Sequence, residues 1–591
     1  MATQALSNLE KRLIEKTMQG VELNCPEIEI GALSATGHPD HVIRAEAIHD
    51  LLTGKYGAHP HGIRVRYARI IGSTPKGAPD PSFEFNGLKT PVGLKLERCV
   101  LNHPILAHDA HFPWLHLDSC RIPYFQADRI RVDGSVYMRG LTTTRSNEQG
   151  AVRLLGAYIG RNLELDRANI RNTFGPAFHA EGIQVDRSLR FRAARIYSDH
   201  NTGAIQLVNA HVHGDLWLDG TSVRNDLGPA LNAEGIRVEG SLLLCAGFVA
   251  TACSEELATV HLMSAQIGSR LDFGTGREIT GDLWDASRGQ ERRLFPRRTA
   301  AISNKLVNES GSRLTIDLSC ASMNELRLPT QTVCEPEKRY LRANKCSSKS
   351  KIIVTGLAYS MLSQESVHPY WPHWLRRHMN HFDGEPYRHL ATIFQNSGRT
   401  VEARRLLIRL ENDRRKANKA QNLWSWLARW PWHIVKRSLI GHGYRPGRAL
   451  LGILGIFMFA TFMLLKTSAG DTIHKPAMRI EGTIVPATSS LSSAPKTPAS
   501  FITPSTSPSP SANVVTFTNP ASRSDGCSKG EAIRLAADIS VPLINTNARL
   551  RCDFRPGSPT GFAIVALLLH VLGWLFATLF VVGVTGIARK D

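Results

Sequence analysis

A long internal repeat constrains this chain more than any other feature. The apolar positions between Val152 and Phe191 recur 53 residues later, between Ile205 and Leu244, and all but one of them are apolar again. The same register runs backward to Phe125 and forward, with a two-residue insertion, to Phe273. A long fixed period indicates stacked units, each of which covers the hydrophobic face of its neighbour.

Within the repeat, the local unit is Leu/Phe-x-x-Ala-x-Ile/Val, as in LDRANI and LVNAHV, and one circuit takes about 26 residues. This pattern predicts a mainly β fold, a right-handed parallel β-helix of the pentapeptide-like solenoid type. Large and small apolar side chains alternate into the bore, and the small slots include Cys99 and Cys120. We expect the Arg, Asp, Asn and Glu residues between them to face water.

Several segments, in this order, resemble a known family. They are IRAEAIHDLL, GIRVRYARIIG, GPALNAEGIRVEGSLLL, EPYRHLATIFQNSGRTVEARRLLIRL, HGYRPGRALLG and AADISVPLI. Together they resemble the pentapeptide-like β-helix proteins of bacteria whose C-terminal part is membrane-bound. The resemblance covers nearly the whole chain and implies the same fold and attachment. Members are often labelled "membrane-associated oxidoreductase", but the matching segments carry no catalytic residue to transfer.

A chain of 591 residues is too long for a single hydrophobic core. Shifts in composition along the chain divide it into seven segments. We expect an N-terminal helical cap at 1–60, the β-solenoid at 61–365, a helical hairpin cap at 366–420, a basic Trp-rich juxtamembrane segment at 421–448, a transmembrane helix at 449–465, a Ser/Thr/Pro-rich disordered loop at 466–560 with a short helix at 530–544, and a second transmembrane helix at 561–588. Terminal caps are required in stacked arrays of this kind.

The excess of basic residues, 71 Lys and Arg against 51 Asp and Glu, is concentrated before the first apolar segment. The residues expected at the membrane surface are Trp424, Trp426, Trp430, Trp432, Lys436 and Arg437. Amphipathic rings and cations at this place favour an anionic lipid headgroup layer as partner. Lipid accounts for them without a groove or stacking platform, so nucleic acid is disfavoured.

The predicted location is the bacterial inner membrane, crossed twice. Flanking Lys and Arg place the solenoid and the C-terminus in the cytoplasm and the loop 466–560 outside, and the chain opens without an export signal. Cys527 and Cys552 are the only cysteines of that loop, so a disulfide between them is a candidate pairing that their unknown geometry leaves open.

The last apolar segment carries further candidate features. His570 lies near its middle, where an ionisable group faces a partner or water. Gly573 and Ala577 form a small-xxx-small pattern that permits close helix contact, within one chain or in a homo-oligomer. Helix, short re-entrant segment and helix in this order suggest a channel-like subunit, although no selectivity sequence is present.

No motif identifies a reaction. The chain has no dinucleotide fingerprint, P-loop, HExxH, GxSxG or CxxC motif. His103, His108, His111 and His116 are clustered, but their spacing fits no familiar site, so neither a metal nor a cofactor is predicted. The leading hypothesis is a membrane-anchored solenoid that serves as an interaction scaffold for a protein partner, without catalytic activity. A channel-like or membrane-effector subunit is the alternative, and an oxidoreductase, by the family label, is the third.

Overall fold

The computed structural model describes most of the chain. The described residues are 6–35, 37–57, 59–72, 82–274, 282–285, 290–293, 304–329, 332, 350–362, 371–421, 447–467, 473–474, 527–541, 546–548, 552–554 and 560–585. The chain divides into two compact units, Met1–Ala417 and Asn418–Asp591. Each unit is described by itself.

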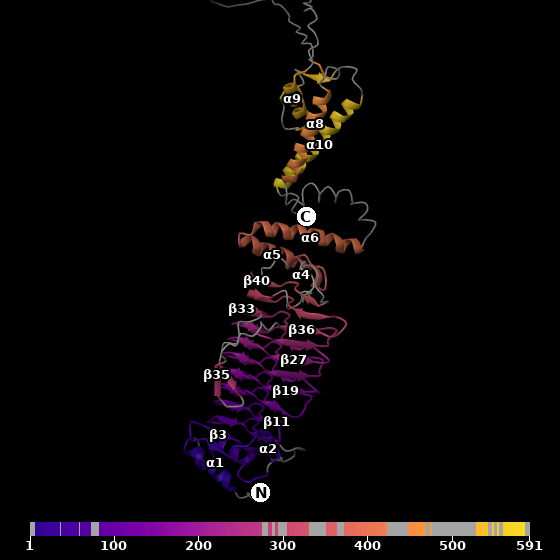
Figure 1. The fold of residues 1–591 in the computed structure, drawn as a ribbon. Coiled ribbons are helices and arrows are strands. Elements are labelled where there is room, and N and C mark those ends of the chain that lie inside the picture. The colour runs from indigo at the N-terminus through magenta and orange to yellow at the C-terminus, as the bar shows by residue number, and fades with distance from the viewer. Residues whose placement is uncertain are drawn as a thin grey trace, which may run out of the picture. The chain divides into compact units, whose positions relative to one another are not determined.

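The first unit is a stack of parallel β-coils between two sets of helices (Figure 1). Each coil has four sides, and every side contributes one strand to a parallel ladder that runs along the stack. We number these ladders as faces 1 to 4. Faces 1 and 4 join in one sheet through the long strand β33, so three parallel sheets enclose the core.

The strands of the four faces are short, and their bounds are as follows. Face 1 contains β1 (Leu23–Asn24), β3 (Ile63–Arg66), β6 (Leu94–Glu97), β10 (Leu115–Asp118), β14 (Val136–Tyr137), β18 (Leu163–Glu164), β22 (Leu189–Arg190), β26 (Leu216–Trp217) and β30 (Leu242–Leu243). Face 2 contains β2 (Val42–Arg44), β4 (Arg69–Ile71), β7 (Val100–Leu101), β11 (Arg121–Ile122), β15 (Thr142–Thr143), β19 (Asn169–Asn172), β23 (Arg195–Ser198), β27 (Ser222–Asn225), β31 (Val249–Ala252) and β36 (Lys305–Asn308). Face 3 contains β5 (Phe83–Glu84), β8 (Ile105–Leu106), β12 (Phe125–Gln126), β16 (Val152–Arg153), β20 (Phe178–His179), β24 (Ile205–Gln206), β28 (Leu231–Asn232), β32 (Val260–His261), β37 (Leu314–Asp317) and β39 (Lys351–Ile353). Face 4 contains β9 (His111–Phe112), β13 (Arg131–Val132), β17 (Tyr158–Ile159), β21 (Gln184–Val185), β25 (His211–Val212) and β29 (Arg237–Val238), and it joins face 1 in β33 (Gln266–Asp272), β38 (Ser322–Arg327) and β40 (Ala358–Leu362).

The register confirms the parallel solenoid and its period. Leu163, Leu189 and Leu216 are paired in successive coils, so two coils make up one long repeat of the sequence. Coil length varies nearer the N-terminus, because the register pairs Ile63 with Leu94 and Leu94 with Leu115. The repeat positions are buried and form one continuous hydrophobic core along the stack.

Each LxxAxI unit turns a corner through a left-handed residue. In LDRANI this residue is Arg167, with φ of 58°, and Gly156, Ala193 and Asn209 occupy the same position in other units. Glycine and asparagine adopt this conformation with little strain, whereas arginine and alanine do not. In this protein, the stacked ladders on both sides of the corner hold these residues in the left-handed conformation.

Some asparagines do not face water, which corrects the expectation from the sequence. Asn172, Asn225 and Asn308, at the ends of face-2 strands, are buried. Each side-chain amide donates to two main-chain carbonyls and accepts from main-chain N–H groups of the adjacent corner. At least one carbonyl in each set also accepts from a backbone N–H, and the amide bonds to the other main-chain groups of the corner as well. A buried amide that makes these bonds is therefore more stable there than an apolar side chain.

Helices cover the first coil. They are α1 (Asn8–Met18), α2 (Ile30–Ala35) and α3 (Ala45–Leu52). Ser7 and Glu10 form a capping box at the start of α1, and Glu10, which is buried, also pairs with Arg44. Within the segment 1–60, expected to be a helical cap, Ile43 lies in strand β2, because it pairs with Ile70 of face 2 and so extends the ladder.

A second group of helices covers the last coil. It comprises α4 (Trp371–His378), α5 (Glu385–Asn396) and α6 (Thr400–Gln421). Gly398, with φ of 74°, separates α5 from α6, and the buried Tyr387 and Leu406 lie in their interface. The ring of His389 hydrogen-bonds to the main chain of Tyr359 in β40. The hairpin therefore closes the hydrophobic edge of the stack.

Two described strands between β33 and β36 lie outside the parallel ladders. They are the antiparallel pair β34 (Asp282–Asp285) and β35 (Gln290–Arg293). β36 is paired with β31 on face 2, and alternate side chains of β36 are buried.

The second unit is a small helical module. It contains α8 (Gly447–Thr467), α9 (Lys529–Ser540), α10 (Thr560–Thr585) and the paired strands β41 (Ile473–His474) and β42 (Asp553–Phe554). α8 and α10 coincide with the two predicted spans. Within the ranges given above, no helix combines the length and the hydropathy needed to cross a membrane, so the two spans are not confirmed.

Candidate functional site

A recess formed by described residues lies on the outside of the solenoid, near its N-terminal end. It has a volume of about 750 Å³ and lies along the border between faces 1 and 4. Its lining residues are Pro60, His61, Arg64, Lys95, Pro113, Trp114, His116, Asp118, Asp133, Gly134, Ser135, Tyr137, Arg139 and Arg161. We call this recess the basic-aromatic groove.

The ladder register aligns the floor of the groove. On face 1, Arg64, Lys95, His116 and Tyr137 are register partners in four successive coils. Register partners in a parallel ladder project on the same side of the sheet, so these residues form one outward column. Two cations at one end of the column are followed by two rings at the other.

The rings of the groove are packed on one another. The His116 ring stacks on the Tyr137 ring at a centroid distance of 4.4 Å, and the Trp114 ring lies 4.9 Å from the His116 ring. Trp114 lies directly over Gly93 and Gly62, where added Cβ atoms would come within 2.1 and 2.7 Å of the indole. Glycines at these two positions therefore let the indole rest on the backbone.

Burial and nearby cations keep His116 neutral. Burial is the main cause that lowers the pKa of His116 to about 3, and the charges of Arg139, Lys95 and Arg64 act in the same direction. Among the described residues, neither ring nitrogen of His116 has a hydrogen-bond partner. The imidazole is therefore uncharged near neutral pH and free to bond with a ligand.

The cations of the groove fall into two groups. Arg139 makes a bidentate pair with the buried Asp118 and lies 4.3 Å from the centroid of the Tyr137 ring, while Lys95 pairs with Glu97. In contrast, Arg64 and Arg161 have no acidic partner in the described part of the chain. Two guanidinium groups are thus available to an anion beside the stacked rings.

The arrangement is suited to binding. Guanidinium groups form bidentate hydrogen bonds with carboxylates, and ring faces provide apolar contact. A neutral imidazole adds a donor and an acceptor. The groove therefore matches an extended ligand that carries negative charges and apolar groups.

The histidine cluster considered from the sequence does not converge on one point. His111 pairs with Asp133, and His108 lies 3.6 Å from Asp128. Only His116 lies in the groove. The groove was not predicted from the sequence, although a signal existed. Trp114 precedes β10 by one residue, His116 lies two residues further along, and the aromatic Tyr137 takes the position of His116 in the next coil.

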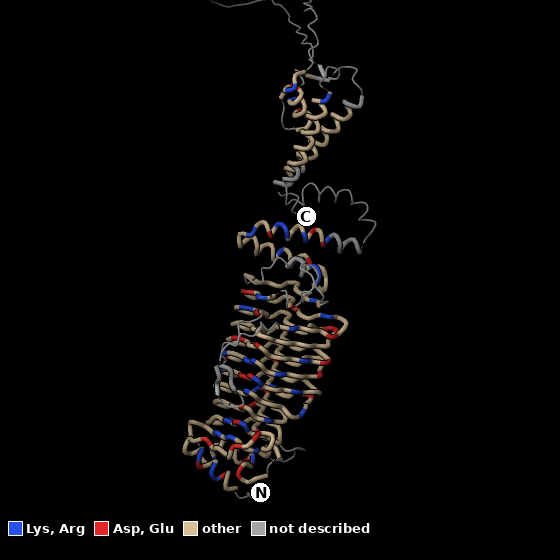
Figure 2. Tube along the Cα trace, in the orientation of Figure 1, with Lys and Arg blue, Asp and Glu red and all other residues tan. Residues whose placement is uncertain are grey.

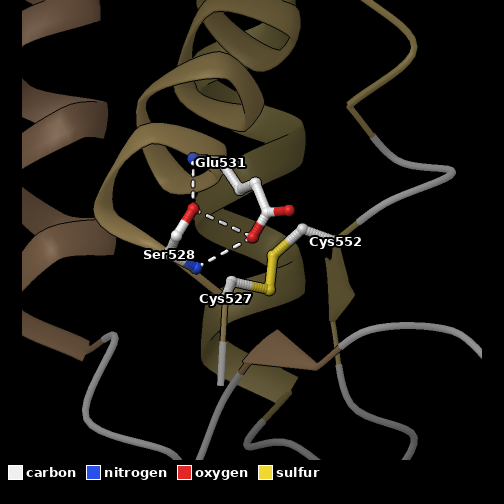
Figure 3. The surroundings of a disulfide bond; sticks show 4 residues. All are labelled: Cys527, Ser528, Glu531 and Cys552. Carbon is white, nitrogen blue, oxygen red and sulfur yellow. Dashed lines mark hydrogen bonds between the residues drawn. A yellow bond between two sulfur atoms is a disulfide. The ribbon is translucent and has the colours of Figure 1, made fainter. Parts of the chain in front are cut away.

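The second unit places several predicted residues around α9. Cys527 and Cys552, the candidate pair, form a disulfide beside the capping box of Ser528 and Glu531 (Figure 3). The His570 ring hydrogen-bonds to the carbonyl of Ile539 at a distance of 3.1 Å. This bond corresponds to a structural role for His570, as a link between α10 and the end of α9.

Both residues of the predicted helix contact, Gly573 and Ala577, are buried in α10. α8 and α10 also approach each other closely at Gly452, where an added Cβ atom would lie 2.2 Å from the Phe576 ring. The predicted membrane-surface residues Trp424, Trp426, Trp430, Trp432, Lys436 and Arg437 lie outside the described residues.

Comparison with known proteins returned no match: no family model, no curated protein and no solved structure is similar to this chain.

Proposed function

We propose that this chain is a membrane-tethered interaction scaffold whose solenoid binds an acidic segment of a partner protein in the basic-aromatic groove. The observation that carries the proposal is the outward column of cations and rings on face 1. The interior of the coils is filled with packed apolar side chains, so a ligand has to bind outside. A stacked array presents such columns as an extended surface, which suits a polypeptide.

Charge complementarity selects the chemistry of the partner. Arg64 and Arg161 lack intramolecular acidic partners among the described residues, so neither has to give up an ion pair when a carboxylate binds. The carboxylates that line the groove, Asp118 and Asp133, are already paired with Arg139, Arg131 and His111. A segment with Glu or Asp next to an aromatic or aliphatic residue fits both parts of the groove.

A binding assay tests the groove. We expect a fluorescein-labelled peptide of alternating Glu and Leu to bind the full chain in detergent, and the double variant Arg64→Glu/Arg161→Glu to bind about tenfold more weakly or worse. The measurement is fluorescence anisotropy at two salt concentrations. Arg195→Glu is the matched control, since Arg195 is exposed on face 2, away from the groove. Equal affinity of the double variant and the wild type would refute the proposal.

The tether rests on the exposed apolar surface of the second unit. Leu451 of α8 is 68% exposed and Leu567 of α10 is 64% exposed, and most side chains around them are apolar as well. Figure 2 shows almost no charged residues along α8 and α10, in contrast to α6. Contiguous apolar surface of this extent is typical of a membrane or protein contact. We assign it to insertion of the two helices into a lipid bilayer.

Cysteine chemistry supports the proposed orientation. The described cysteines of the solenoid are free thiols, namely Cys25, Cys99, Cys120, Cys245, Cys253 and Cys320. Cys527 and Cys552 of the second unit are joined. Disulfides persist in oxidising compartments, whereas thiols remain free in a reducing cytosol. The solenoid therefore belongs on the cytoplasmic side and the disulfide on the other side of a bacterial inner membrane.

Alkaline extraction tests the tether. We expect most of the full chain to stay in the membrane pellet after carbonate treatment. A chain with Leu451→Asp and Leu567→Asp should shift largely to the supernatant, because charged side chains are costly in hydrocarbon. The control is Leu227→Asp, at an exposed leucine of the solenoid. Complete release of the wild-type chain by carbonate would exclude insertion.

A further inference from the structure

We infer that His211, His213 and Glu239 form a divalent-metal site on face 4 of the solenoid, selective for zinc or a similar borderline cation. Each of these residues offers one ligand atom, and the three atoms lie within 4.8 Å of one another. Imidazole nitrogen and carboxylate oxygen are ligands that zinc prefers. The site lies several coils away from the basic-aromatic groove and does not depend on the function proposed for it.

The ladder explains why the two histidines are adjacent. His211 begins β25, and His213 follows that strand, so residues two apart project on the same side. Their rings stack at a centroid distance of 4.1 Å. Glu239 follows β29 in the next coil, where the register pairs His211 with Arg237 and thus brings Glu239 next to His213.

Both histidines direct the same ring nitrogen toward one carboxylate oxygen. The Oε1 atom of Glu239 lies 3.3 Å from Nε2 of His211 and 4.0 Å from Nε2 of His213. In a tetrahedral zinc site with bonds near 2.0–2.1 Å, neighbouring ligand atoms are about 3.3 Å apart. The Nε2 atom of His211 already has this spacing from Oε1 of Glu239. The Nε2 atom of His213 would have to move less than about 1 Å toward the same oxygen, and both side chains are partly exposed.

A carboxylate lies on the far side of the His213 ring. The Nδ1 atom of His213 is 3.7 Å from Oδ1 of Asp186, and the hydroxyl of Tyr158 donates to Oδ2 of Asp186 at 2.6 Å. A carboxylate near the far nitrogen is the usual neighbour of a metal-binding histidine, and it leaves Nε2 for the metal. Three protein ligands on an open face leave the fourth position of the metal to water.

The internal repeat provides a natural comparison. One long repeat earlier, Tyr158, Gly160 and Asp186 occupy the positions of His211, His213 and Glu239. That set contains one ligand side chain instead of three. At an earlier coil of the same face, His111 pairs with Asp133, but Pro113 stands where His213 does. Of the three positions compared, which begin at His111, Tyr158 and His211, only the last combines two histidines with a carboxylate.

Metal counting tests the inference. The full chain, without a polyhistidine tag and with exposed thiols alkylated, is dialysed against micromolar ZnCl₂, and bound zinc is counted by mass spectrometry. We expect His211→Ala/His213→Ala to bind about one zinc ion fewer per chain than the wild type. The control is His111→Ala. His111 also pairs with a carboxylate, that of Asp133, but no histidine follows two residues later. This variant should bind as much zinc as the wild type.

A spectroscopic measurement separates a metal site from a simple ion pair. Co²⁺ in place of zinc should give the intense visible absorption of four-coordinate cobalt, and Glu239→Gln should weaken or remove it. Circular dichroism checks that the variants, which change an outer face, keep the fold. Equal zinc content of the wild type and the double histidine variant would overturn the inference and leave His211 and Glu239 as an ion pair only.

Discussion

Replacement of Asn225 by alanine should destabilise the solenoid by about 3 kcal/mol, because it removes four hydrogen bonds at one corner of a coil. The Pro229 carbonyl keeps the N–H of Ala204 as a partner, whereas the main-chain groups of His200 and Leu227 lose theirs. The Asn225 side chain is fully buried. Its Nδ2 donates to the carbonyls of His200 and Pro229 at 2.8 and 2.7 Å, and its Oδ1 accepts from the N–H groups of His200 and Leu227. Each unsatisfied buried group costs about 1–3 kcal/mol, and water entering the cavity offsets part of the sum.

The measurement is urea unfolding of the full chain, followed by the circular dichroism of the β-sheets. Asn169→Ala is the matched control: Asn169 begins β19 on the same face, but its side chain is exposed. We expect the control to change the stability by less than about 0.5 kcal/mol. If both variants unfold at the same urea concentration, the buried amide has no stabilising role.

Replacement of Phe191 by alanine should cost about 3–5 kcal/mol, which is the usual range for removing a buried aromatic ring. Phe191 is fully buried, and its ring packs edge-to-face against that of Phe178 at a centroid distance of 5.0 Å. Adjacent coils support each other only through their interface, so the cavity weakens the contact with both neighbours. We expect the thermal midpoint of the sheet signal to fall by several degrees.

Phe174→Ala is the control for this prediction, since Phe174 lies close to Phe178 in the sequence but is 67% exposed. Its replacement should leave the midpoint unchanged within about one degree. A similar loss of stability in both variants would mean that aromatic content, rather than burial in the coil, determines the effect.

The periodic positions made the solenoid predictable. Leu163, Leu189 and Leu216 return at a nearly fixed spacing, and a parallel ladder is the structure that buries such a column. The caps were predictable for the same reason, since the ends of a stack expose apolar edges. α1 also carries a local signal, the capping box of Ser7 and Glu10.

Polar residues were harder to place. Asn225 and an exposed asparagine such as Asn169 look alike in the sequence, because burial at a corner depends on which main-chain groups the fold brings within reach of the side chain. A helical cap was predicted for 1–60, but Ile43 within it belongs to strand β2. Local periodicity does not reveal that a neighbouring coil offers a strand edge to pair with.

By itself, the sequence determined the repeat, the parallel stack and the positions of its apolar columns, because those follow from spacing along one chain. Only the tertiary structure decided which outward residues meet. The groove joins Arg64 to Tyr137 through four coils, and the metal ligands His211 and Glu239 come from two. The coils near the N-terminus differ in length from those of the long repeat, so the residue above any given side chain is fixed by the register of the folded ladder.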